Sequence, residues 1–318
     1  MIRLFIITVL MVSFSGISVA QEFGARRESE LASYSQNMAN PLEMRVSAAR
    51  ALRGFDGPNA LIAVSRASRD SEVEMRLAAI DAAAHWSITG KWDLLYPLTS
   101  DPEFMVQKSA LYALLAHWQE FDKPMKLSLE HSLEMLEAQM PTNIESELEL
   151  AWVEQATGKI DEAEARLIGL SKSIEDVRVI LGLSKVQLQN QGELKASATL
   201  QKGIEIFPGE SLLYYELAKI DHAKGDELSA AKNFETAHSL SPENSTYTYT
   251  FAVAIKDSDP DRAIDLFSLA YQRSQDPIHL YAQCDRLLAT KKEATSCIEE
   301  LKQVAPDYIV QNLISLYL

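Results

Sequence analysis

The chain has 318 residues, is 47% hydrophobic and contains only 12 Gly and 11 Pro. This composition indicates a folded protein with a sizeable core rather than a low-complexity segment. Its formal net charge of -15 argues against binding to nucleic acid, which needs a basic stripe, and against an anionic membrane surface. The charge is typical of a soluble protein kept apart from other proteins by repulsion; a preference for basic partners is the alternative.

The first residues predict an export signal. Arg3 precedes an apolar run over 4–12, and the small residues Ser18 and Ala20 stand at the end of the segment. This pattern predicts a signal peptide at 1–20, cleaved after Ala20, and therefore a periplasmic protein. The apolar run is short for a membrane span, so no membrane span is expected, and a single anchor is the alternative.

The segment 21–124 repeats with a period of 31 residues. After a predicted helix at 25–37, four columns keep one kind of side chain in three successive copies: Leu42, Val73, Phe104; Met44, Met75, Val106; Ala48, Ala79, Ala110; and Ala51, Ala82, Ala113. A fixed period of this size predicts stacked helical hairpins. Apolar positions three and four apart predict amphipathic helices, whose alanines let neighbouring helices approach closely.

A turn with Asp101-Pro102 and a helix containing Met75-Arg76 match the pattern of short HEAT-like repeats. Residues 21–124 resemble that family, although Gln107 stands where the pattern has arginine. A predicted connecting helix over 125–143 follows and joins this array to the next one.

The segment 144–306 repeats with a period of 33 to 34 residues. Alanine marks each copy a few residues after a turn, at Ala163, Ala196, Ala230, Ala263 and Ala294. With glycine turns at 158, 192 and 225, the pattern resembles the tetratricopeptide (TPR) repeat, most clearly over 211–244. Residues 307–318 are predicted to form a capping helix. The expected fold is all-α, a right-handed α-solenoid of stacked helical hairpins in which HEAT-like repeats precede TPR repeats.

The two cysteines, Cys284 and Cys297, lie in one predicted hairpin. In an oxidising compartment they can form a disulfide between its two helices. The alternative is a pair of buried small apolar side chains.

No sequence motif indicates catalysis. The phosphate-binding, dinucleotide-binding, zinc-protease and nucleophile-elbow signatures are all absent from the sequence. We therefore expect no enzyme activity, no cofactor and no metal site.

The order of the two arrays resembles the C-terminal scaffold of exported multihaem c-type cytochromes, including the stretch at 247–254. Those proteins attach haem through Cys-x-x-Cys-His, which this sequence lacks. The resemblance implies the scaffold without the redox domain.

The TPR resemblance implies an inner groove lined by the first helix of each repeat. The aromatic and cationic residues at those positions are Trp152, Arg178, Lys185, Tyr215, Lys219, Tyr249 and Lys256. Such a lining suits a protein or peptide partner with an acidic residue or free carboxylate; alternatively the cations are merely solvated and the tyrosines pack between repeats. The sequence thus predicts a non-enzymatic periplasmic scaffold or adaptor, with an accessory subunit of an exported respiratory or multihaem cytochrome complex as the alternative.

Overall fold

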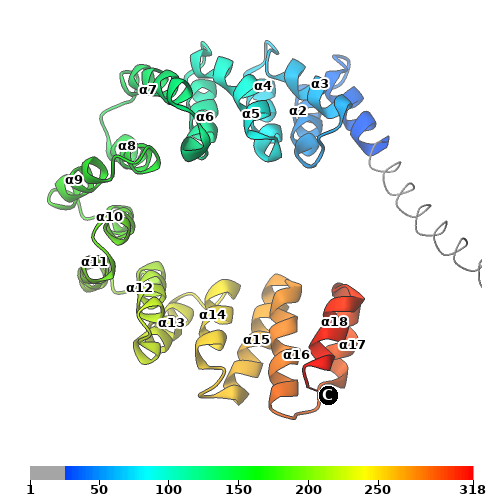
Figure 1. Cartoon of the computed structure of the whole chain (residues 1–318), viewed down its shortest axis with the longest axis vertical. Coiled ribbons are helices and arrows are strands. Elements are labelled where there is room, and N and C mark those ends of the chain that lie inside the picture. The colour runs from blue at the N-terminus through cyan, green and yellow to red at the C-terminus, as the bar shows by residue number, and fades with distance from the viewer. Residues whose placement is uncertain (1–25, 318) are drawn as a thin grey trace, which may run out of the picture. The chain divides into compact units, whose positions relative to one another are not determined.

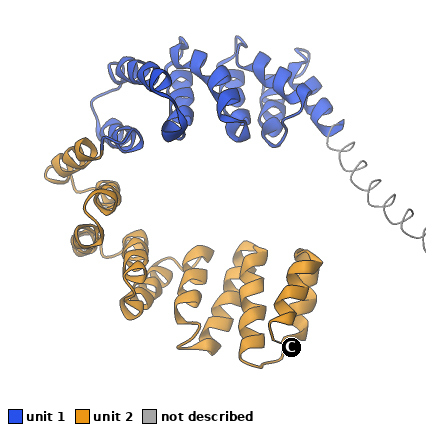
Figure 2. Ribbon diagram, in the orientation of Figure 1, with its two compact units in different colours: residues 1–159 blue, residues 160–318 orange. Residues whose placement is uncertain are grey.

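The computed structural model describes residues 26–317, and all regular structure in that range is helical (Figure 1). The predicted signal peptide at 1–20 lies outside the described residues. The chain divides between Lys159 and Ile160 into two compact units, each described here by itself (Figure 2). The first unit therefore includes the helix over Ile144–Ala156, with which the sequence analysis opens the second array.

The first unit is a row of short helices, several of which end in a 3₁₀ turn. A helix over 26–36 comes first. It is followed by α2 (Leu42–Ala51), α3 (Pro58–Ala67), α4 (Val73–Ala82), α5 (Ile88–Leu95), α6 (Phe104–Leu115), α7 (Lys123–Glu137) and α8 (Ile144–Ala156). The 3₁₀ turns are Leu52–Gly54, Ala83–His85, Tyr96–Ser100 and Trp118–Glu120.

The helices α2, α4 and α6 begin successive copies of the 31-residue repeat, and each packs on the next. Ala48, Ala79 and Ala110 are buried in these contacts. The next alanine column is less uniform, because Ala51 is exposed whereas Ala82 is fully buried.

Buried arginine–aspartate pairs link successive hairpins of this unit. Arg45 donates from Nη2 to Oδ2 of Asp70 at 2.6 Å, and one repeat later Arg76 donates from Nη2 to Oδ1 of Asp101 at 3.0 Å. Each arginine therefore reaches the turn that precedes the next first helix. Gln107, at the third position of this series, instead donates to the backbone carbonyl oxygen of Asp101 at 2.5 Å.

The second unit consists of longer helical hairpins. Its helices are α9 (Ile160–Ser171), α10 (Val177–Asn190), α11 (Glu193–Ile206), α12 (Ser211–Ala223), α13 (Glu227–Leu240), α14 (Ser245–Ile255), α15 (Pro260–Ser274), α16 (Pro277–Ala289), α17 (Thr295–Val304) and α18 (Asp307–Ser315). Gly192 and Gly225 take positive φ angles in the turns after α10 and α12, as the glycine pattern predicts. Lys291 also takes a positive φ angle after α16, where no glycine is available.

The alanines predicted to mark successive repeats are buried in the second unit, on α9, α11, α13 and α15 and directly before α17. Ala163, Ala196, Ala230 and Ala263 are 0% exposed and Ala294 is 7% exposed. The bulky residue four positions later is buried in every copy, at Leu167, Leu200, Phe234, Phe267 and Ile298. The period of the sequence therefore corresponds to a repeated packing contact.

A buried carboxylate ties the first three helices of the second unit together. Glu164 of α9 accepts hydrogen bonds from Lys195 at 2.6 Å, from Asn190 at 3.0 Å and from Gln191 at 2.9 Å. Burial by itself raises the pKa of Glu164, but the hydrogen bonds and the Lys195 charge outweigh it, so the pKa lies below its usual range. The group is therefore charged and paired at neutral pH.

A disulfide closes the C-terminal hairpin. Cys284 of α16 is bonded to Cys297 of α17, with 5.6 Å between their Cα atoms. The bridge lies in an apolar cluster with Leu280 and Leu301, on which α18 packs through Val310.

We predict that enlarging one alanine contact destabilises the second unit. Ala218 of α12 is fully buried, so Ala218→Leu should reduce the free energy of unfolding by about 1–3 kcal/mol through overpacking. Urea unfolding followed by circular dichroism measures this change. Ala223→Leu, at an exposed site on the same helix, is the matched control and should have little effect. Equal stability of both variants would mean that α12 does not pack as described.

We predict a large cost for breaking the buried ion pair of the first unit. Arg76→Met leaves the buried Asp101 carboxylate without its cation and should cost about 3–5 kcal/mol of unfolding free energy. The control is Arg50→Met, because the Arg50–Asp81 pair also links neighbouring repeats but is half exposed; its loss should cost about 0–1 kcal/mol. Thermal unfolding of the two variants compares them directly, and a similar loss in both would refute the structural role of the buried pair.

Candidate partner-binding groove

A cavity of about 490 Å³ opens between α10 and α12, the first helices of two successive hairpins. Most of its wall is aliphatic: Leu181 and Leu188 from α10, Leu200 from α11, and Leu212 and Ile220 from α12. Leu181 and Leu188 stand seven residues apart on α10, and Leu212 and Ile220 stand eight apart on α12, so each of these two helices turns one apolar face to the cavity. Leu188 is 44% exposed, which leaves part of that face accessible to a partner.

Two lysines stand on the cavity wall. Lys185 and Lys219 occupy the same position of α10 and α12, 34 residues apart, and both line the cavity. Lys219 is already paired: its Nζ lies 2.8 Å from Oε2 of Glu216, which also lines the cavity. Lys185 is exposed and has no ion-pair partner within residues 26–317. The cavity therefore presents one unpaired ammonium group and one that an internal carboxylate holds.

Tyr215 contributes to the groove indirectly. Its ring lies 5.6 Å from the Lys219 ammonium group, which limits the directions that this side chain can take. The ring itself packs against Tyr247 at 4.7 Å and Phe234 at 5.7 Å between centroids. Tyr215 is thus a packing residue beside the cavity and not part of its wall.

The remaining aromatic residues predicted for the groove also pack against neighbouring helices. Trp152 lies on α8 in the first unit, with its ring 4.9 Å from that of Tyr112. Tyr249 stacks on His279 at 4.6 Å, and burial raises the pKa of its phenol. Tyr215 and Tyr249 thus both pack between repeats, which is the alternative that the sequence leaves open for the groove tyrosines.

The two other predicted cations stand away from the cavity. Arg178 pairs with Asp176, with 2.7 Å between Nη2 and Oδ2, and its hydrogen bonds hold the pKa of that carboxyl below its usual range. Lys256 follows the last turn of α14, where its backbone carbonyl oxygen accepts from Arg286 at 3.1 Å. The cavity thus brings together Lys185 and Lys219 alone of the predicted groove residues.

Glu216 lines the cavity but is not among the residues predicted for the groove. It stands three residues before Lys219 on one helix, a spacing at which opposite charges pair on the helix surface. A search for such pairs would find it. Leu200 also lines the cavity from α11, a second helix, whereas the TPR resemblance implies groove positions on first helices only.

Two further observations concern the described part of the chain. Between residues 26 and 317, no group of three or more His, Cys, Asp or Glu side chains is arranged to hold a metal ion. No helix in that range is long and apolar enough to cross a bilayer.

The fold and the cavity define the class of protein: an all-α protein built from repeated helical hairpins. Among known proteins, no family model matches the chain and no curated protein matches it. Solved structures to which the chain is similar include TPR proteins. YrrB, described as a TPR protein with an unusual peptide-binding site, is 13% identical with a TM-score of 0.44, over 52% of this chain and 88% of YrrB. A TPR protein from Parabacteroides merdae is 15% identical with a TM-score of 0.44, over 70% of this chain and 84% of that one.

Proposed function

We propose that the protein is a non-enzymatic periplasmic scaffold that binds a protein or peptide partner in the cavity between α10 and α12. One observation carries this proposal: two lysines, in a chain of net charge -15, stand together on a mainly aliphatic cavity. Both lysine side chains are exposed.

The chemistry of the cavity favours a partner that presents an apolar side chain close to a carboxylate. The apolar group would cover Leu181, Leu188 and Leu212, whose burial is favourable by about 25 cal/mol per Å². The carboxylate would accept charge-assisted hydrogen bonds from Lys185, each worth about 1.5–3 kcal/mol. To reach Lys219 as well, it must displace the carboxylate of Glu216.

The proposed location is supported by two features of the chain. The sequence begins with a pattern typical of an export signal. The disulfide between Cys284 and Cys297 is of a kind that persists in oxidising compartments such as the periplasm.

We predict that reversing both charges of the cavity abolishes partner binding. Lys185→Glu combined with Lys219→Glu replaces two attractive groups by repulsive ones, so a carboxylate partner should lose at least about tenfold in affinity. Partner recovery from a periplasmic extract by the immobilised mature protein, quantified against the unmodified protein, measures this loss, and circular dichroism should show an unchanged helical signal.

The matched control for this prediction reverses exposed charges outside the cavity. Lys172→Glu with Lys302→Glu makes the same change in net charge at exposed positions. Recovery of the partner should stay unchanged. An equal loss of partner recovery in both double variants would mean that net charge alone causes the loss. No loss in the cavity variant would exclude this groove as the binding site.

We predict that Glu216→Gln increases the affinity for the same partner. The substitution keeps the shape of the side chain but releases the Lys219 ammonium group and removes the negative charge of the cavity wall. Titration with the partner recovered above, by calorimetry, measures the change. Glu205→Gln, at an exposed site of α11, is the control. Weaker binding after Glu216→Gln would instead show that the partner presents a basic group.

A further inference from the structure

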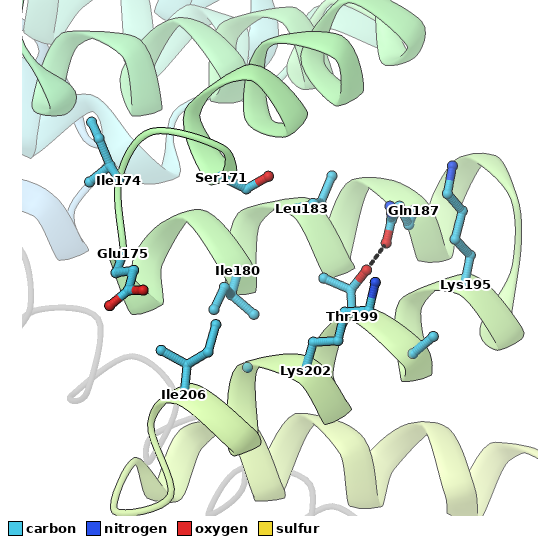
Figure 3. A pocket seen from close by; sticks show the side chains of 12 residues that line it. Ser171, Ile174, Glu175, Ile180, Leu183, Gln187, Lys195, Thr199, Lys202 and Ile206 are labelled. Atoms are coloured by element: carbon cyan, nitrogen blue, oxygen red, sulfur yellow. Dashed lines mark hydrogen bonds between the residues drawn. The ribbon is translucent and has the colours of Figure 1, made fainter.

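A second cavity, of about 420 Å³, lies on the other side of the hairpin formed by α10 and α11 (Figure 3). Its walls come from the end of α9, the connection between α9 and α10, and the outer face of α11. Ile180 and Leu183 of α10 line it, whereas the groove described above uses the neighbouring positions Leu181 and Lys185. The two cavities are therefore separate, with one hairpin between them.

The sequence gives a reason why this space is open. Ile180 and Ile174 stand 34 residues before Tyr214 and Pro208, their counterparts in the next hairpin. There the hydroxyl group of Tyr214 donates to the carbonyl oxygen of Pro208 at 3.1 Å and ties the helix to its connection. Ile180 has no hydroxyl group to donate to the connection, and because its side chain is smaller than that of tyrosine it leaves room at the same corner of the earlier hairpin.

The cavity has an apolar end. Ile180 and Ile206 lie close to each other there, Ile174 lines the cavity from the connection before α10, and Ile174 and Ile206 are 38% and 48% exposed (Figure 3). Gly203 belongs to the same wall: a Cβ atom at this position would come within 2.7 Å of Cγ2 of Ile180. The glycine thus allows α10 and α11 to approach closely beneath the cavity.

The opposite end is polar and cationic. Gln187, which is buried, accepts a hydrogen bond from the hydroxyl group of Thr199 at 2.6 Å, and Lys195 and Lys202 of α11 stand beside them (Figure 3). The charge of Lys195 is offset by Glu164 at 2.6 Å. Lys202 has no ion-pair partner within the described part of the chain, so it supplies the uncompensated charge of this end.

We propose that this cavity binds a small amphipathic carboxylate, with its alkyl chain against the three isoleucines and its carboxylate group at Lys202. The size suits such a ligand, since sites for small molecules commonly measure about 300–1,000 Å³ and are mainly apolar with a few polar groups. The positive charge of Lys202 favours an anionic ligand, because a cationic amphiphile of the same shape would bring its ammonium group next to that of Lys202. The carboxylate of Glu175 lies at the isoleucine end and does not compete for this lysine (Figure 3).

The test compares two probes of equal length and opposite charge, octanoate and octylamine, by ligand-observed NMR on the mature protein. Octanoate should bind saturably and octylamine should not. Lys202→Gln, a change at an exposed site that leaves the fold intact, should weaken octanoate binding by about tenfold or more, because it removes a charge-assisted contact. Saturable binding of both probes, or no effect of Lys202→Gln, would overturn the proposal.

A second variant fills the cavity. Ala198 lines it from an exposed position of α11, so Ala198→Trp should abolish octanoate binding. The control is Lys232→Trp, at the equivalent exposed position of α13, 34 residues later, where binding should persist. Lys185→Glu in the groove should also leave octanoate binding unchanged. Loss of binding in Lys185→Glu, or its persistence in Ala198→Trp, would place the probe elsewhere and refute the site.

Discussion

The close contact of helices at small side chains is the constraint on which the rest of the structure depends. In the second unit an alanine is fully buried at the same place in four successive hairpins, and a bulky apolar residue follows it by one turn. A hairpin cannot bury these side chains alone, so its stability comes from its neighbours. The positions of every first helix, and with them the spacing of Lys185 and Lys219, follow from this contact.

The hairpin formed by α10 and α11 borders two cavities and a buried polar network. Successive residues of α10 line two different cavities, because a helix turns adjacent positions about 100° apart. The same helix supplies Gln187 and Asn190 to the buried carboxylate of Glu164. One element thus carries the groove, the second cavity and the polar network that fixes its own position.

The sequence predicts the repeated hairpins well and the site only in part. Alanine columns and glycine turns report local contacts that recur with the period, so the helices and the positions of Lys185 and Lys219 follow from them. The pairing of Lys219 with Glu216 does not follow from the period, because a comparison of equivalent positions between repeats does not consider pairs three residues apart on one helix. Trp152 and Tyr249 could not be assigned either, since an aromatic side chain at a groove position packs sideways when a neighbouring ring is within reach.

The bridge between Cys284 and Cys297 has a consequence for the way in which the array comes apart. Terminal units of a repeat array have a neighbour on one side only, so fraying normally begins there. The hairpin formed by α16 and α17 contains the turn at Lys291, whose positive φ angle is uncommon for a residue other than glycine. The covalent link between its two helices keeps them together through such opening events. In this part of the array α16 and α17 therefore separate from their neighbours as one linked hairpin and not one helix at a time.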